Sequence, residues 1–343
     1  MKKQLLTLAI SVFAFSSFAK IRIVDNAPNN GKNYSSLQAA IDDSAPGDTV
    51  YIKENFNQNS ATYGDIIIDK KIVLIGACAY NSSSYKYSYV NTITFKGYSC
   101  DDSEIHGLNV GVISIGTNRC KNLVFKNNEL DQIYPLVEDG EFSNFKFINN
   151  TINSCLFPKY LSNGNMYLND FLFSNNIINQ IVMYTPNEKH DKIFNVNITV
   201  ANNIIQNFAG RHCLLENNII TMIPGHTTNF YDCILHNNGI FNDVISDENI
   251  IAGNNFKDII FRDPPQTSEY FDKYSIYNTA GTDGTAIGIK GGRYPWNSIE
   301  NNNKNVDAIY PVSLPKVGEV NINSGSLPTN GTLNVNIKAK SIK

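Results

Sequence analysis

The side chains best suited to hold a ligand lie in three loops of the chain, at residues 134–141, 158–165 and 184–191. Aromatic rings beside polar groups can contact sugar rings and bond to their hydroxyls. These loops are therefore predicted to bind a glycan, with solvated turns as the alternative that the residues leave open. The candidate ligand-binding residues are Tyr134, Tyr160, Tyr184, Lys189, His190 and Asp191.

Catalytic residues stay unassigned, because no complete catalytic constellation occurs in the sequence. A lyase acting on acidic polysaccharides needs a base and usually carboxylates that hold calcium, whereas a hydrolase needs two acids at a set separation. The chain offers only isolated fragments, such as Asp101-Asp102, Pro224-Gly225-His226 and Arg262-Asp263-Pro264. We expect no cofactor and no metal site; calcium would be needed only by a lyase.

The six cysteines are expected to be free thiols in a core. Cys78, Cys100 and Cys120 are spaced at nearly regular intervals, and Cys213 and Cys233 occupy one position of two successive repeats. Stacked core cysteines act as small apolar residues. Disulfides are the alternative in an exported chain with an even cysteine count, although parallel Cβ vectors fit that bond poorly. No Cys-x-x-Cys or Cys/His cluster suggests zinc.

The element that must position these residues is a short apolar strand followed by Asn-Asn. Steps of about 15 to 27 residues between copies are typical of a solenoid in which each repeat is one layer. A leucine-rich repeat would show a fixed Leu-x-x-Leu-x-Leu frame, and a propeller would show a longer period. The seven copies lie at residues 123–128, 145–150, 171–176, 198–203, 213–218, 233–238 and 250–255.

Within each copy the apolar residues alternate, which indicates a strand with one buried face. Another apolar residue follows the Asn pair, so the chain bends there, and Asn tolerates the left-handed conformation that such a bend needs. This pattern predicts an all-β, single-stranded parallel β-helix. Stacked amides can bond along the helix as a ladder. We assign the ladder to the first Asn of six pairs: Asn127, Asn149, Asn175, Asn202, Asn217 and Asn237.

Two segments carry a resemblance to known proteins. Residues 34–41, 46–52 and 66–76 read YSSLQAAI, PGDTVYI and IIIDKKIVLIG, which resembles the N-terminal part of the pectate-lyase-like β-helix superfamily. The resemblance implies a right-handed parallel β-helix with a short N-terminal capping helix. Residues 280–295, AGTDGTAIGIKGGRYP, resemble the closing segment of exported β-helix proteins of Bacteroidetes-type bacteria. Neither resemblance specifies an activity.

Five regions are expected along the chain. Residues 1–19 read as a signal peptide cleaved near Ala19, with an apolar run shorter than a membrane span needs. The other regions are an N-terminal cap with the first strands (20–70), the coils (71–262), a turn-rich closing segment (263–310) and a C-terminal β-hairpin (311–343).

The expected protein is secreted, periplasmic or on the cell surface, is a monomer and does not span a membrane. Its net charge of −3 gives no reason to expect nucleic acid. The function predicted first is non-catalytic binding of a polysaccharide, a surface glycan or another partner along the loop-bearing side. Two alternatives stay open: a polysaccharide lyase or glycoside hydrolase with a diverged active site, and a structural or adhesive surface rod.

Overall fold

The computed structural model describes residues 19–27, 31, 33–54, 62–77, 88–137, 139–157, 165–183, 193–220, 229–240, 250–252, 279–296, 316–322 and 335–340. The predicted signal peptide lies outside these residues except for Ala19, and so does most of the predicted closing segment.

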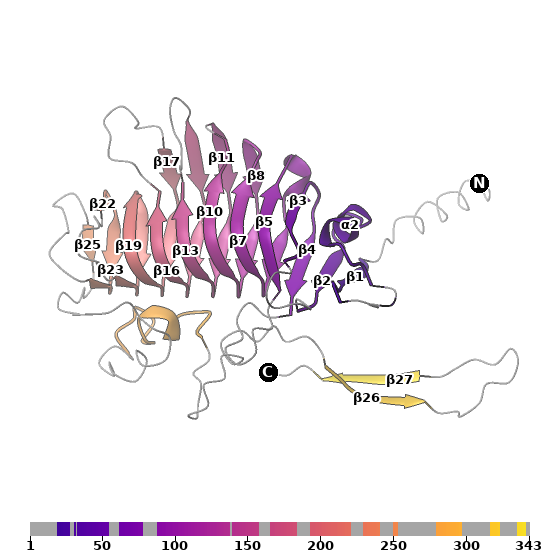
Figure 1. Ribbon diagram of the computed structural model, residues 1–343. Coiled ribbons are helices and arrows are strands. Elements are labelled where there is room, and N and C mark those ends of the chain that lie inside the picture. The colour runs from indigo at the N-terminus through magenta and orange to yellow at the C-terminus, as the bar shows by residue number, and fades with distance from the viewer. Residues whose placement is uncertain are drawn as a thin grey trace, which may run out of the picture.

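Three parallel sheets wrap around one core; sheets A and B run along the length of the solenoid, and sheet C covers only its middle coils (Figure 1). Sheet A is formed by β1 (Ile21–Val24), β2 (Thr49–Ile52), β4 (Val73–Gly76), β6 (Glu104–His106), β9 (Val124–Lys126), β12 (Lys146–Ile148), β15 (Leu172–Ser174), β18 (Ile198–Ala201), β20 (Cys213–Glu216), β23 (Ile234–His236) and β25 (Ile250–Ala252).

Sheet B is formed by β3 (Asp65–Ile68), β5 (Tyr89–Phe95), β7 (Asn109–Ile115), β10 (Glu129–Pro135), β13 (Thr151–Leu156), β16 (Ile177–Val182), β19 (Ile204–Arg211), β21 (Ile219–Ile220) and β24 (Gly239–Ile240), and β22 (Asn229–Tyr231) pairs with β19. Sheet C is formed by β8 (Arg119–Lys121), β11 (Gly140–Ser143), β14 (Met166–Asn169) and β17 (Ile193–Val196). Each coil adds one strand to sheet A, then one to sheet B and, in the middle of the solenoid, one to sheet C. The predicted single-stranded parallel β-helix is confirmed.

Both predicted accessory elements are present. The short helix α2 (Leu37–Asp42) is capped by Ser36, whose Oγ accepts a hydrogen bond from the backbone N–H of Ala39. The helix buries Leu37 and Ile41 at the N-terminal end of the core. Near the C-terminus, β26 (Lys316–Ile322) and β27 (Val335–Lys340) pair antiparallel, as predicted for the hairpin. Within the described residues, no helix is long and apolar enough to cross a membrane.

Stacked apolar columns fill the core. The rings of Phe125, Phe147 and Phe173 lie in three successive coils of sheet A, with centroids 5.0 Å and 4.7 Å apart and nearly parallel planes. These phenylalanines are fully buried. Since aromatic pairs add stability beyond the area that they bury, the columns explain why one strand position repeats phenylalanine in consecutive coils.

The asparagine ladder lies one residue later than predicted. The first Asn of each pair takes the left-handed conformation, with φ between 50° and 58° from Asn127 to Asn237. The backbone therefore turns at this residue, and the side chain of the second Asn points into the core. The assignment of the ladder to the first column was wrong; the ladder is formed by Asn128, Asn150, Asn176, Asn203, Asn218 and Asn238, each fully buried.

Each amide in the ladder has several partners. The backbone N–H and the Nδ2 of Asn150 both donate to Asn176 Oδ1, at 2.8 Å and 3.0 Å, and its Nδ2 also donates to the carbonyl of Phe125 at 2.9 Å. Asn150 Oδ1 in turn accepts from the backbone and the amide of Asn128. Because every such group is buried, the ladder satisfies the backbone groups that the corner would otherwise leave without partners.

The first column of asparagines holds the closing segment, of which residues 279–296 are described and include the short 3-10 helix η3 (Gly288–Lys290). Asn175 Nδ2 donates to the carbonyl oxygens of Ile289 and Gly291, at 3.2 Å and 2.6 Å, and the indole N–H of Trp296 donates to the carbonyl oxygen of Asn175. Asn217 also bonds to this segment: its Nδ2 donates to Thr282 Oγ1 and its Oδ1 accepts from the backbone N–H of Thr282. The closing segment is thus fastened to the corner between sheets A and B.

Trp296 offers a direct test of this docking, because it is the only tryptophan in the chain and is 6% exposed. Its fluorescence in the folded protein is expected at short wavelength, as for a buried indole. Asn175→Gly keeps the left-handed backbone of Asn175 but removes both amide bonds to the segment. We therefore expect its emission to shift to longer wavelength and its quenching by iodide to increase. The same emission spectrum in Asn175→Gly and in the matched variant Asn149→Gly would contradict the docking.

Candidate functional site

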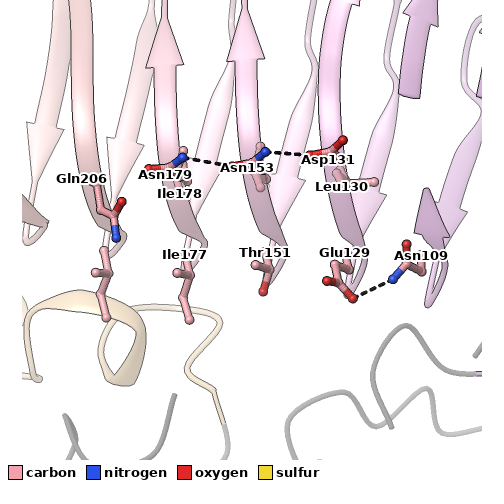
Figure 2. Close-up of a pocket in the computed structure, with 12 residues that line it drawn as sticks. Asn109, Glu129, Leu130, Asp131, Thr151, Asn153, Ile177, Ile178, Asn179 and Gln206 are labelled. Carbon is pink, nitrogen blue, oxygen red and sulfur yellow. Dashed lines mark hydrogen bonds between the residues drawn. The ribbon is translucent and has the colours of Figure 1, made fainter. Parts of the chain in front are cut away.

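A shallow groove on the outer face of sheet B is the candidate functional site. It extends from the start of β7 across β10, β13, β16 and β19, has a volume of about 210 Å³ and is drawn in Figure 2. Its lining consists of Asn109, Glu129, Leu130, Asp131, Thr151, Ile152, Asn153, Ile177, Ile178, Asn179, Ile204 and Gln206.

Strand register brings two columns of side chains to this groove. The column directly after the Asn ladder contains Asn109, Glu129, Thr151, Ile177 and Ile204, paired across five successive coils. The groove column, which lies two residues further along each strand, contains Asp131, Asn153, Asn179 and Gln206. The residue between the columns, such as Leu130, points into the core, because side chains alternate along a strand.

The polar side chains of the groove hold one another in place. Asn153 Nδ2 donates to Asp131 Oδ1 at 2.6 Å, and Asn179 Nδ2 donates to Asn153 Oδ1 at 2.9 Å, so three successive coils are joined (Figure 2). In the other column, Asn109 Nδ2 donates to Glu129 Oε2 at 2.7 Å. Side chains fixed in this way lose less freedom when a ligand binds, which favours affinity.

Glu129 has the largest electrostatic perturbation in the groove. The pKa of its carboxyl group is raised to about 7, chiefly by burial; the hydrogen bond from Asn109 opposes this shift in part, and the negative charge of Asp131 adds to it. The carboxyl group of Glu129 therefore gains or loses a proton near neutral pH. A carboxyl group with such a pKa can donate as well as accept a hydrogen bond.

The other end of the groove is apolar. Ile177 is partly exposed, while Ile204 is 3% exposed although it belongs to the outer face of sheet B. Gly288 of the closing segment covers this position: a Cβ at residue 288 would lie 2.8 Å from Ile219 Cδ1 and 3.7 Å from Ile204 Cγ1. The closing segment therefore borders the groove where the polar side chains give way to isoleucines.

The charge of the groove is negative. Asp131 and Glu129 are its ionisable side chains, and no Lys, Arg or His lines it among the described residues. Carboxylate and amide oxygens accept hydrogen bonds from hydroxyl groups, amide nitrogens donate them, and isoleucine side chains can contact the apolar face of a ring. The arrangement thus suits a neutral ligand rich in hydroxyl groups better than an anion.

The predicted ligand-binding residues are not in this groove. Tyr134 lies near the end of β10, half-buried and paired in register with Ser114 of β7. Tyr160, Tyr184, Lys189, His190 and Asp191 lie outside the described residues, so no contact between them is seen. The first predicted loop is also shorter than expected, because β10 extends to Pro135 and β11 begins at Gly140.

Sequence reasoning missed the groove column although a signal for it was present. Asp131, Asn153, Asn179 and Gln206 each follow the second Asn of a pair by three residues. A carboxylate or amide at one outward position of four successive copies indicates a polar row on the surface.

No protein-family model, no curated protein and no solved structure matches the chain. The class of protein is therefore defined by its own architecture, which is a single-stranded parallel β-helix with an asparagine ladder and a polar groove on one outer face.

Proposed function

We propose that this chain is an exported β-helix protein that binds a neutral glycan, without cleaving it, in the groove of sheet B. The observation that carries the proposal is the pair of side-chain columns held by hydrogen bonds across successive coils, with amides and carboxylates at one end and isoleucines at the other. This combination is suited to sugar rings, which present hydroxyl groups at their edges and carbon–hydrogen groups on their faces.

The repeat of the groove favours a polymer over a single sugar. Neighbouring coils are about 4.8 Å apart, and the column of Asp131, Asn153 and Asn179 offers a similar polar group in each of three coils. A linear oligosaccharide lying along the solenoid axis would meet the same kind of partner at each step. The two carboxylates would repel uronic acids, which argues against pectate and alginate as ligands.

Export is part of the proposal and rests on the N-terminal sequence. The backbone nitrogen of Lys20 lies 2.7 Å from Oδ1 of Asp48, a carboxylate that is 2% exposed and also contacts Arg22. Cleavage after Ala19 would convert this nitrogen into a charged amino group beside a buried carboxylate, which is a favourable pairing. The mature chain is proposed to be secreted, periplasmic or on the cell surface.

We likewise propose that the chain belongs to the pectate-lyase-like superfamily and is related to exported β-helix proteins of Bacteroidetes-type bacteria. The segments that carry the resemblance form α2, β2, β3 and β4 at one end, and part of the segment fastened to the Asn corner at the other. Their positions are compatible with a cap and a closing segment.

A glycan array tests the proposed function. We expect the full mature chain at pH 7.5 to bind neutral oligosaccharides of several units and to leave uronic acid polymers unbound. Incubation with pectate, alginate or chondroitin and calcium should release no unsaturated, ultraviolet-absorbing products. Binding confined to anionic glycans, or calcium-dependent release of such products, would contradict the proposal.

One observation favours glycoside hydrolysis as a second candidate. A carboxyl group with a raised pKa beside a second carboxylate is the pairing that lets one group act as an acid while the other stays ionised. Glu129 and Asp131 provide such a pair in the groove. Release of reducing sugar from a bound neutral oligosaccharide, with loss of that activity in both Glu129→Gln and Asp131→Asn, would replace binding by hydrolysis as the function.

A further inference from the structure

A cluster of three metal-binding side chains lies away from the groove, where sheet C begins. Cys100 ends the short 3-10 helix η1 (Tyr98–Cys100), Asp101 follows it, and Cys120 lies in β8 of the next coil. One ligand atom from each of the three lies within 4.8 Å of the other two. In the described part of the chain, no other group of three or more Cys, His, Asp or Glu side chains meets this condition.

The distance between the two sulfur atoms fits a tetrahedral cation. Cys100 Sγ and Cys120 Sγ are 3.7 Å apart. Two thiolates bound to one tetrahedral zinc ion, each at about 2.3 Å, lie about 3.8 Å from one another. A zinc ion could therefore be bound without separating the coils. The sequence hides this site, because the two cysteines are 20 residues apart and are brought together by the stacking of coils.

Neighbouring groups contact Asp101 and Cys100 in the absence of metal. The backbone N–H of Lys121 donates to Asp101 Oδ1 at 2.9 Å, and in the thiol form Cys100 Sγ donates to the carbonyl oxygen of Gly97 at 3.0 Å, a hydrogen bond that zinc binding would replace. Both cysteines are fully buried, whereas the Asp101 side chain is 19% exposed. A fourth ligand could thus reach the ion as water from the side of Asp101.

The charges also balance. Binding of zinc breaks two S–H bonds and forms two Zn–S bonds, and both protons pass to the solvent. Two thiolates, one carboxylate and Zn²⁺ carry a net charge of −1. Lys121 Nζ lies 3.9 Å from Asp101 Oδ2 and offsets this charge.

We propose that Cys100, Asp101 and Cys120 form a zinc site that fastens η1 to β8. Since β8 is the edge strand of sheet C, the ion would join the edge to the preceding coil and limit pairing with other chains. The site is independent of the proposed function, because none of its ligands lines the groove.

Cys213 and Cys233 provide a matched control. They are also buried thiols of adjacent coils, at one inward position of β20 and of the residue before β23, but no third ligand lies within the same distance among the described residues. Cys→Ala at either position therefore changes the core by the same few atoms without changing a predicted zinc ligand.

The test is zinc binding by the full mature chain, reduced with a phosphine, stripped of metal and then supplied with zinc sulfate. After gel filtration we expect one zinc ion per chain, and cobalt(II) in its place should give an absorption band of thiolate-bound cobalt. Cys100→Ala and Cys120→Ala should lose the ion, and Asp101→Asn should weaken binding about tenfold or more. Cys213→Ala should bind zinc like the parent chain.

Two results would overturn the proposal. One is a reduced, folded chain that holds no stoichiometric zinc; the other is equal binding by the parent chain and by Cys100→Ala. Weaker zinc binding by Asp101→Asn would not be explained by loss of the fold, because this substitution changes a side chain that reaches the surface. A peptide map showing a Cys100–Cys120 disulfide in unreduced protein, together with no zinc bound after reduction, would assign the pair to a disulfide instead.

Discussion

Asn150→Gly is expected to lower the free energy of unfolding by on the order of 3–6 kcal/mol, whereas Asn149→Gly should change it by about 1 kcal/mol or less. Loss of the Asn150 amide leaves the carbonyl of Phe125 and both the backbone and side-chain donors of Asn128 without that partner in a dry core. An orphaned buried group of this kind costs about 1–3 kcal/mol. Asn149 has φ of 54°, which Gly adopts freely, and its Oδ1 has no hydrogen-bond partner within the described residues.

Urea unfolding of both variants, followed by circular dichroism, measures this difference. The pair is well matched, because the same substitution is made at adjacent residues of one corner. Equal destabilisation of the two variants would show that the ladder does not depend on the second Asn. Greater destabilisation of Asn149→Gly would return the ladder to the first column.

Glu129→Gln is expected to stabilise the protein at pH 8.5 by on the order of 1–3 kcal/mol and to have almost no effect near pH 4.5. The pKa of Glu129 is raised from 4.5 to about 7 in the folded chain. The folded state therefore holds the proton more tightly than the unfolded state. The resulting stabilisation is complete below about pH 4.5 and is lost as pH rises through about 7. Above that pH the partly buried carboxyl group is ionised and destabilises the fold, and glutamine avoids this charge while keeping an oxygen for Asn109.

Thermal unfolding at pH 4.5, 6, 7 and 8.5 gives the required comparison. Glu141→Gln is the control, since it removes a carboxylate from the exposed outer face of β11. For Glu129→Gln the difference in melting temperature from the parent should grow as pH rises from about 4.5 to about 7 and then level off. A difference independent of pH, or one that appears equally in Glu141→Gln, would contradict the burial of Glu129.

The solenoid was predictable because its physical requirements repeat in the sequence. Alternating apolar residues followed by Asn-Asn require a strand and then a bend, and the register confirms this in every described copy. The ladder position was harder, since residue type cannot distinguish the two members of an Asn pair. The coil before the first Asn pair shows which member points inward. Gly107 has φ of 63° where later coils have the first Asn, and buried Leu108 occupies the position of the second.

The candidate sites could be predicted only in part, because they depend on which residues of different coils lie side by side. Asp131, Asn153 and Asn179 are separated by 22 and 26 residues and meet only through the strand register. Cys100 and Cys120 likewise meet through stacking, and neither has the local spacing by which zinc ligands are recognised. The raised pKa of Glu129 arises from partial burial on the outer face of sheet B. The alternation of side chains along a strand predicts only that Glu129 faces outward, not that neighbouring groups shield it from water.

The most direct test of glycan binding in the groove is the affinity of Thr151→Arg and Thr199→Arg for the best neutral oligosaccharide found on the array, measured by calorimetry. Thr151 lies in the groove between Glu129 and Ile177, while Thr199 lies on the outer face of sheet A between Leu172 and Leu214. Both changes place the same long cation on the outer face of a central strand. We predict at least about tenfold weaker binding for Thr151→Arg, equivalent to about 1.4 kcal/mol, and unchanged binding for Thr199→Arg. Unchanged binding in Thr151→Arg would contradict the proposal that the groove of sheet B holds the glycan.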